Sequence, residues 1–227
     1  MKASIAVPAY EMKGRGSAFL RSLLSSVHAQ DFKEIEVVVS DDSTDDEIER
    51  LCKEASEFLN LRYLRHKGQK RSSSNVNNAI LNSTGDVVKV LFQDDFLFDK
   101  RSMTWVMESH ETGSKWSLSS CVHTYDGSRF FRHHVPSFHP KGYLGENLAG
   151  SPSGLSFTRE CDELFDENLV WLMDCELYHR LYLKCGNPHI IPHPAVANRL
   201  WEGQVTNQVD EAVKTHELSY VWRKFNA

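Results

Sequence analysis

The first hundred residues alternate short apolar runs, rich in β-branched residues, with longer stretches whose apolar residues recur every three or four positions. This alternation is typical of a parallel sheet whose strands are joined by crossover helices. The apolar runs predict strands at 4–7, 36–39, 61–64 and 86–92. The periodic stretches predict helices at 17–29, at 47–52 with Ser43 as its cap, and at 74–82. The predicted fold class is therefore α/β with a central, mainly parallel sheet.

The second half of the chain carries a weaker pattern. It predicts a helix near 101–110, strands near 117–122 and 129–134, and helices at 171–184 and 208–225. The Pro-, Gly- and His-rich stretch His133–Ser153 predicts a long functional loop. No repeat or low-complexity linker divides the 227 residues, of which 41% are hydrophobic, so we expect one domain over 1–227.

Composition excludes several classes of protein. No run of about 18 uncharged apolar residues predicts a transmembrane segment, and the N-terminus lacks the pattern of a signal peptide, so we expect a cytoplasmic protein. The five cysteines form no Cys-x-x-Cys pair, which argues against a disulfide framework or a zinc knuckle. A net charge of -5 argues against a protein that mainly grips nucleic-acid phosphates. The oligomeric state stays open.

Acidic residues follow three of the predicted strands, at the edge of the sheet where α/β proteins bind ligands. Glu11 follows the first strand, Asp41 and Asp42 the second, and Asp94 and Asp95 the fourth. For Asp41 or Asp45 taken alone, a helix cap is an equally good interpretation. Neighbouring carboxylates repel each other unless a cation or hydrogen-bond donors compensate them, and oxygen ligands suit Mg²⁺ or Mn²⁺. The sequence therefore predicts a site for a metal and a diphosphate.

Five segments together resemble glycosyltransferase family 2. IAVPAYE at 5–11, VVVSDDSTD at 37–45 and NNAILNSTGDVVKVLFQDD at 77–95 resemble the family's opening turn, second strand end and Asp-x-Asp-Asp segment. GSPSGLSFTRE at 150–160 resembles the family's acceptor-side strand. FDENLVWLMDCELYHRL at 165–181 resembles the helix that carries its catalytic carboxylate. The resemblance implies a GT-A fold, which is Rossmann-like with three layers and a smaller acceptor-side region. It also implies inverting transfer of a sugar from a nucleotide-sugar donor, most often a UDP-sugar, to an acceptor hydroxyl.

Carried over to this chain, the resemblance implies a role for each matching residue. Asp174 would be the general base, Asp95 the ligand of Mn²⁺ or Mg²⁺, and Asp42 the acceptor for the nucleobase N–H. The expected contacts to the nucleotide sugar are Pro8, Ala9, Tyr10, Glu11, Asp42, Lys70, Arg71, Asn77, Gln93, Asp94 and Trp201. Residues 1–99 would bind the donor and residues 100–227 the acceptor.

This chain departs from the family pattern at two positions. Phe92 stands where the family has the first Asp of its Asp-x-Asp, so metal binding would rest on Asp94 and Asp95. Val76 stands where an Arg often precedes the Asn, so Lys70 or Arg71 would supply the positive charge.

Alternatives remain for the other candidate residues. Asp174 shares a helix face with Tyr178 while Glu176 points away, but either acid could be a solvated helix charge. Trp201 could stack on a sugar, cap the donor or pack in the core. The histidines of the second half lack a helical i, i+4 pair and suggest acceptor contacts or plain loop residues more than zinc: His123, His133, His134 and His139.

Two rival functions also remain. A sugar nucleotidyltransferase would need a Gly-rich basic loop after the first strand, of which Lys13–Gly16 is a faint version. An inactive nucleotide- or sugar-binding module is disfavoured by the intact acidic residues. The acceptor could be a saccharide, a lipid-linked saccharide, a protein, a small molecule or a hydroxymethylated base of nucleic acid.

Overall fold

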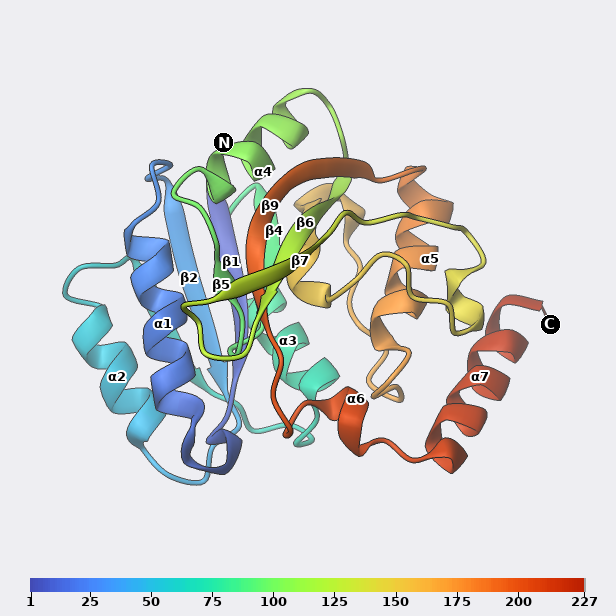
Figure 1. The fold of residues 1–227 in the computed structure, drawn as a ribbon, viewed down its shortest axis with the longest axis horizontal. Coiled ribbons are helices and arrows are strands. Elements are labelled where there is room, and N and C mark those ends of the chain that lie inside the picture. Colours follow the sequence, from blue (N-terminus) through green and yellow to red (C-terminus); the bar gives the residue numbers. More distant parts are fainter. Residues whose placement is uncertain (227) are drawn as a thin grey trace.

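The computed structural model describes residues 1–226, and its first half follows the order predicted from the sequence (Figure 1). Its elements are β1 (Ala3–Ala9), α1 (Gly16–His28), β2 (Ile35–Asp41), α2 (Glu47–Ala55), β3 (Leu61–Arg65), α3 (Ser72–Leu81) and β4 (Val87–Val90). Each predicted strand and helix of this half is present, with boundaries that differ by a few residues.

The second half contains more strands than its sequence pattern predicts. Its elements are β5 (Phe96–Leu97), α4 (Ser102–Glu111), β6 (Trp116–Thr124), β7 (Phe130–His134), β8 (Leu155–Thr158), α5 (Met173–Cys185), β9 (His189–Arg199), α6 (Val205–Gln208) and α7 (Glu211–Asn226). The predicted loop 133–153 is confirmed after His134, with one short 3-10 turn, η2 (Gly142–Leu144). A second 3-10 turn, η3 (Pro152–Gly154), leads directly into β8.

All nine strands belong to one mainly parallel sheet, in the order β3-β2-β1-β4-β8-β6-β9-β5, with β7 paired to β6. β1 pairs in parallel with β2 and β4, and β6 pairs in parallel with β9. β8 runs antiparallel to both β4 and β6. Because β1, β2 and β4 run in one direction, the residues that follow them meet at one edge of the sheet.

Helices cover both faces of this sheet and form three layers (Figure 1). Alternate residues of β1 point to opposite faces, as expected for a strand. Ile5 and Val7 join the hydrophobic cluster of α1, α2 and α4. Ala6 joins the cluster of α3 and α5, to which Val221 of α7 also belongs. The expected α/β architecture with three layers is therefore confirmed.

The prediction that Ser43 caps the second helix is wrong. α2 begins at Glu47, and the Asp45 carboxylate accepts the Glu47 N–H at 3.0 Å. The Ser43 hydroxyl has no hydrogen-bond partner among the described residues. Asp45 performs the capping because its side chain is short enough to reach an amide two residues further along the chain.

No helix of residues 1–226 is long and apolar enough to cross a membrane.

Candidate functional site

Two adjoining hollows lie where the acidic residues follow β1, β2 and β4. The first, here called the Asp42 pocket, has a volume of about 350 Å³, and the second, the Asp94 cleft, has a volume of about 440 Å³. Both are lined by Tyr10, Met12, Ser72, Phe92, Val170 and Val205. A ligand that occupies one hollow can therefore extend into the other, as an elongated nucleotide sugar requires.

Asp42 enters its pocket from the first position after β2. Its backbone N–H donates to the Ala9 carbonyl at 2.9 Å, which joins the ends of β1 and β2. Its carboxylate Oδ1 lies 2.6 Å from Nδ1 of His66, and both side chains are nearly buried. Burial raises the pKa of Asp42, while the hydrogen bond from His66 opposes that rise.

The other polar residues of the Asp42 pocket come from the segment around the start of α3. Lys70 and Arg71 line the pocket, and the Arg71 guanidinium donates to the Glu167 carbonyl at 3.0 Å. Asn75 also lines it, with its amide N–H₂ held by the Ala9 carbonyl at 2.9 Å. Asn75 Oδ1 is buried without a partner among the described residues, which marks it as an acceptor that a ligand can satisfy.

Asp94 is the half-buried carboxylate of the Asp94 cleft. The indole N–H of Trp201 donates to Asp94 Oδ2 at 2.9 Å. Oδ1 accepts no hydrogen bond from another residue within 1–226. The Trp201 ring packs edge-on against Phe19, with centroids 5.6 Å apart, and lies under Arg15. Trp201 therefore forms a wall of the cleft and orients Asp94. Burial raises the pKa of Asp94, and the Trp201 hydrogen bond opposes this effect.

Asp95 also lines the cleft, but its carboxylate is already occupied. Both oxygens accept from the Asn198 amide at 2.9 Å, Oδ1 accepts from the Arg199 N–H at 2.9 Å, and Oδ2 accepts from the Ser151 hydroxyl at 3.3 Å. Burial and the neighbouring Asp94 raise the pKa of Asp95 to about 7. With its lone pairs taken by protein donors, Asp95 is better suited to joining β9 to the end of β4 than to binding a cation.

A fully buried lysine supports the wall of the cleft. Lys89 lies on β4 with no exposed surface, and its ammonium donates to the carbonyls of Ser153 and Leu155. Ser153 in turn accepts the Phe92 N–H at 3.0 Å. Burial lowers the pKa of Lys89 to about 7, with Asp95 opposing the shift.

Asp174 lies in the first turn of α5 and also lines the Asp94 cleft. Its Oδ2 accepts from the Asn147 amide at 2.7 Å and its Oδ1 from the Cys175 N–H at 2.8 Å. The side chain is buried, and this burial raises the pKa of Asp174 to about 6. Asp174 is therefore not a solvated helix charge, and its pKa suits a base that works near neutral pH.

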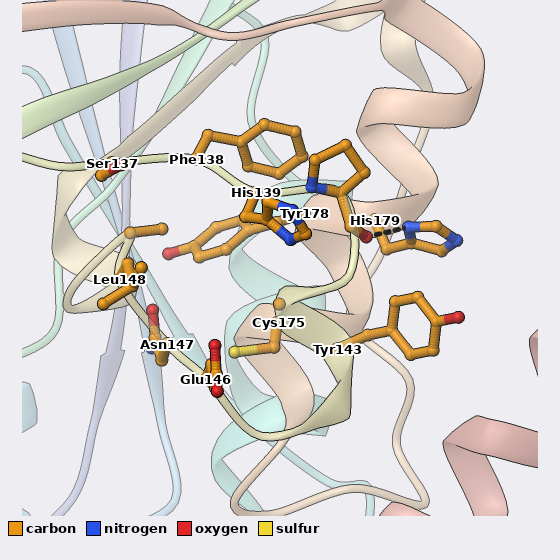
Figure 2. A pocket seen from close by; sticks show the side chains of 13 residues that line it. Ser137, Phe138, His139, Tyr143, Glu146, Asn147, Leu148, Cys175, Tyr178 and His179 are labelled. Carbon is orange, nitrogen blue, oxygen red and sulfur yellow. Dashed lines mark hydrogen bonds between the residues drawn. The ribbon is translucent and has the colours of Figure 1, made fainter.

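The loop that carries Asn147 is anchored on α5. Figure 2 shows residues of the loop around a small cavity of about 10 Å³, with Cys175, Tyr178 and His179 of α5 on its other side. The His179 ring hydrogen-bonds the Pro140 carbonyl at 2.8 Å. Because loop and helix pack together, Asn147 and Asp174 are positioned as a unit.

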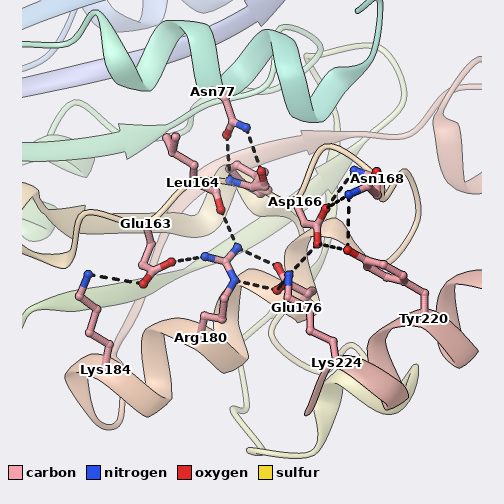
Figure 3. Close-up of polar contacts among 11 residues, drawn as sticks. Asn77, Glu163, Leu164, Asp166, Asn168, Glu176, Arg180, Lys184, Tyr220 and Lys224 are labelled. Atoms are coloured by element: carbon pink, nitrogen blue, oxygen red, sulfur yellow. Dashed lines mark hydrogen bonds and ion pairs between the residues drawn. The ribbon is translucent and has the colours of Figure 1, made fainter. Parts of the chain in front are cut away.

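Glu176, the other acid of the helix, belongs to an ion-pair network on the far side of α5 (Figure 3). It is fully buried, accepts from Arg180 at 2.7 Å and lies 2.9 Å from the Lys224 ammonium. Arg180 also pairs with Glu163. Glu176 is thus neither a solvated charge nor a residue of the cleft.

Glu217 of α7 holds the start of the helix that carries Asp174. Its buried carboxylate accepts three backbone N–H groups, those of Val170, Trp171 and Leu172, at 2.8 to 3.0 Å. Amides that precede a helix have no partner within it, and a carboxylate there also complements the helix dipole. The position of Asp174 therefore depends on a residue of the last helix.

The remaining residues proposed from the sequence fall into two groups. Pro8 and Glu11 line the Asp42 pocket. Ala9, Gln93 and Asn77 do not line either hollow. The Gln93 amide bridges the Tyr10 N–H and the Gly16 carbonyl, at 2.9 and 2.7 Å, and Asn77 is hydrogen-bonded to the Phe165 backbone (Figure 3). These residues position the walls of the site.

Several site residues were not predicted from the sequence. His66 follows the third strand at the same sheet edge, so its position could have signalled a partner for Asp42. The family resemblance points to Asn77, whereas Asn75 of the same helix is the asparagine that lines the Asp42 pocket. Asn147 lies in the predicted loop 133–153, where the sequence draws attention to histidines and not to this residue, whereas Asn198 and Arg199 end β9, for which the sequence pattern predicts no strand.

Within residues 1–226, no group of three or more His, Cys, Asp or Glu side chains gathers as a metal cluster. Mg²⁺ and Mn²⁺ usually keep waters and share substrate phosphates, so one or two protein carboxylates suffice. Asp94, with Oδ1 open to the cleft, fits a cation that is shared with a diphosphate.

Comparison with known proteins gives a family match over most of the chain. The model of "Glycosyl transferase family 2" matches residues 4–196. A GalNAc(5)-diNAcBac-PP-undecaprenol β-1,3-glucosyltransferase of Campylobacter jejuni is 27% identical over 134 residues, which cover 56% of this chain and 40% of that protein. The matched part of this chain thus spans less than half the length of that relative.

Solved structures share the fold at low sequence identity. TarS 1–349 of S. aureus in complex with UDP-GlcNAc has a TM-score of 0.73 at 20% identity, covering 100% of this chain and 67% of that one. The mannosyltransferase PcManGT from Pyrobaculum calidifontis, in complex with GDP-Man and Mn²⁺, has a TM-score of 0.68 at 14% identity. It covers 98% of this chain and 63% of that one. The fold of the chain is therefore the GT-A fold.

Proposed function

This chain belongs to glycosyltransferase family 2, and from that premise we propose that it transfers a sugar from a nucleotide-sugar donor to an acceptor hydroxyl with inversion. The observation that carries the proposal is the arrangement of three carboxylates around two connected hollows. Asp42 lines one hollow, and Asp94 and the buried Asp174 both line the other. One end can bind a nucleotide while the other performs chemistry.

The donor is proposed to be a UDP-sugar whose base occupies the Asp42 pocket. Tyr10 lines both hollows and offers an aromatic ring on which a base can stack. Lys70 and Arg71 bring positive charge to the pocket that adjoins the diphosphate. The UDP-GlcNAc in the TarS complex supports a uridine donor, and the GDP-Man in the PcManGT complex is the competing precedent.

Asp94 is the proposed ligand of a divalent cation, in place of the Asp95 expected from the sequence. Asp94 keeps one open oxygen, whereas each oxygen of Asp95 accepts two protein hydrogen bonds, which fills its lone pairs. A bound Mg²⁺ or Mn²⁺ would neutralise negative charge on the departing nucleoside diphosphate. The Mn²⁺ in the PcManGT complex supports this assignment.

In the proposed reaction, Asp174 accepts the proton of the acceptor hydroxyl. The hydroxyl oxygen forms its bond to the anomeric carbon while the bond from that carbon to the diphosphate oxygen breaks, and the diphosphate keeps the electron pair. Asn147 holds Asp174 Oδ2 from the loop side at 2.7 Å, so it orients the base toward the cleft. The raised pKa of Asp174, about 6, gives it enough basicity to work at neutral pH.

The acceptor is proposed to bind on the side of the cleft formed by the loop 137–150 and α5. Asn147, Gly150, Trp171 and Asp174 line the cleft there. The name of the Campylobacter relative describes a saccharide on an undecaprenyl carrier, which supports a lipid-linked saccharide among the possible acceptors. On this proposal residues 1–99 hold most of the donor, and residues 100–227 hold the acceptor.

The direct test is release of the nucleoside diphosphate from a panel of nucleotide sugars with Mn²⁺ and candidate acceptors. The proposal expects release from a UDP-sugar by the unmodified chain, and little release by Asp174→Asn. If nucleotides raise the melting temperature but no sugar is ever transferred, the chain is a binding module and the proposed activity is wrong.

A further inference from the structure

We propose that His66 determines which nucleobase the Asp42 pocket selects. Because its ring already hydrogen-bonds one oxygen of the Asp42 carboxylate, only the other oxygen is uncontested, which favours uracil over guanine. This inference rests on the proposed function, because it assumes that the Asp42 pocket holds the base of the donor.

The geometry around His66 fixes the Asp42 carboxylate. His66 follows β3, and its backbone N–H donates to the Asp41 carbonyl at 2.9 Å, which places the ring beside Asp42. Nδ1 lies 2.6 Å from Asp42 Oδ1, and Nε2 lies 3.4 Å from the Ser74 hydroxyl. The side chains of His66 and Asp42 are only 7% and 10% exposed. A neutral imidazole that donates from Nδ1 can accept from Ser74 at Nε2, so both sides of the ring are held.

Asp42 Oδ2 is the oxygen that remains for a ligand. No other side chain or amide among residues 1–226 donates to the Asp42 carboxylate, and Asp42 lines the pocket. Uracil presents one ring N–H between two carbonyl groups on its pairing edge. Guanine presents two adjacent donors, a ring N–H and an amino group, which match both oxygens of an unobstructed carboxylate in a bidentate pair. With Oδ1 already accepting from His66, guanine must share that oxygen with the imidazole to form the bidentate pair, whereas uracil needs only Oδ2.

The donors in the same pocket also match uracil. Lys70 and Arg71 line it and carry N–H groups, which the two uracil carbonyls can accept. Asn75 Oδ1 is the other open acceptor, and its direction is fixed because the amide nitrogen is tied to Ala9. A guanine shared between Asp42 and Asn75 is the competing arrangement. A ribose hydroxyl on Asn75 is compatible with uracil on Asp42.

Calorimetric titration with UDP and with GDP tests the inference. We expect the unmodified chain to bind UDP at least about tenfold more tightly than GDP, the effect of roughly one buried hydrogen bond. His66→Phe keeps the ring volume but frees Oδ1, so UDP should bind more weakly and the preference for UDP should shrink toward equality. His66→Asn keeps an N–H near the position of Nδ1 and should retain most of the preference.

The control and a second disrupting variant separate specificity from stability. His28→Phe changes an exposed histidine of α1 outside the pocket and should alter neither affinity. If His66→Phe does not fold, His66→Gln replaces it, because its amide reaches the position of Nε2 and leaves Oδ1 free.

Three results would overturn the inference. The first is an unmodified chain that binds GDP as tightly as UDP or more tightly, which would leave the glycosyltransferase proposal intact with a different base. The second is a His66 variant that lowers the affinities for UDP and GDP by the same factor, since that result would give His66 a purely structural role. The third is an unmodified chain that binds neither nucleotide, which removes the proposed donor site and the inference together.

Discussion

Three carboxylates of the site differ in what surrounds each oxygen, and these differences assign their roles. Asp42 shares one oxygen with an imidazole, Asp94 shares one with an indole, and Asp95 shares both with protein donors. A carboxylate can bind a ligand only through a lone pair that the protein leaves open, and each carboxylate oxygen has two. Asp95 accepts two hydrogen bonds on each oxygen, whereas Asp174 accepts one on each and keeps lone pairs free. The sequence shows three acids at one sheet edge but not which of their oxygens are free.

The first residue-scale prediction concerns Asp174. Asp174→Asn should leave UDP affinity within about twofold while kcat falls by roughly 10²–10⁴, the usual effect of a positioned general base. The base must be deprotonated to work, and its pKa is about 6. At saturating donor and Mn²⁺, kcat of the unmodified chain should therefore fall tenfold per pH unit below about pH 6. A pH–rate profile measures this limb, and a limb that persists in Asp174→Asn would assign it to another group.

The second residue-scale prediction separates Asp94 from Asp95. Asp94→Asn should weaken Mn²⁺-dependent donor binding about tenfold or more with little loss of stability, because it removes the open carboxylate. Asp95→Asn should instead lower the free energy of unfolding by about 1–3 kcal/mol, because it disturbs hydrogen bonds at a buried site. Calorimetry and urea denaturation of both variants decide the assignment. The reverse pattern would return the metal to Asp95.

At the scale of elements, β4 anchors the start of β8, because the buried Lys89 ammonium donates to the carbonyls of Ser153 and Leu155. Folding lowers the pKa of Lys89 from its ordinary value to about 7. Between that value and the unfolded pKa of about 10.5, the unfolded chain binds more protons. Stability should therefore rise with pH in this window.

Lys89→Met tests this prediction, because it keeps the length of the side chain without the charge. From pH 7.5 to 9, the free energy of unfolding of the unmodified chain should rise relative to Lys89→Met by roughly 2 kcal/mol, at about 1.4 kcal/mol per pH unit. Urea denaturation at the two pH values measures the difference. Parallel pH dependence of the two proteins would show that Lys89 stays charged when folded.

The elements of the first half could be predicted because each strand is a short run with apolar residues, β-branched in β1, β2 and β4, and apolar residues recur at helical spacing between the strands. β9 could not, because Pro192 and Pro194 interrupt its pattern, and prolines argue against an inner strand. β9 accommodates Pro194 at a shift in its register with β6. The partners of Asp95 at the end of β9 were missed for the same reason.

The family resemblance points to Asp42, Asp94 and Asp174, which line the two hollows, but it does not distinguish pocket residues from the residues that support them. Asn77 matches a family position and yet binds the Phe165 backbone, whereas Asn75 lines the pocket. Which of two asparagines on one helix faces the pocket depends on how the helix is rotated against β1. That rotation is set by tertiary packing, which a single sequence does not reveal.

At the scale of the whole molecule, the site depends on contacts between distant segments. Asp95 is held by the end of β9, Asp174 by the loop that follows β7, and the start of α5 by Glu217 of α7. Figure 1 shows α7 beside α5, away from the strands that carry the donor residues. The catalytic geometry is therefore a property of the assembled fold.

Glu217→Gln tests this dependence. The amide offers one acceptor oxygen to three backbone N–H groups, so the free energy of unfolding should fall by about 1–3 kcal/mol. Because the start of α5 loosens, kcat should fall more than the affinity for UDP. Glu211→Gln, a neighbouring exposed acid on the same helix, is the control and should change neither quantity. Unchanged kcat in Glu217→Gln would mean that α5 holds Asp174 in place without the hydrogen bonds that the Glu217 carboxylate accepts.

The contact between the Glu217 carboxylate and the backbone before α5 also has a consequence for the order of events on the ribosome. Most of the residues that line the Asp42 pocket precede residue 93, whereas the residue that caps the start of α5 is made well after α5 itself. A domain generally folds as a unit, after its segments have emerged from the exit tunnel. The catalytic carboxylate Asp174 should therefore reach its working position only after α7 has been made and has docked, so a nascent chain that still lacks α7 should not transfer a sugar.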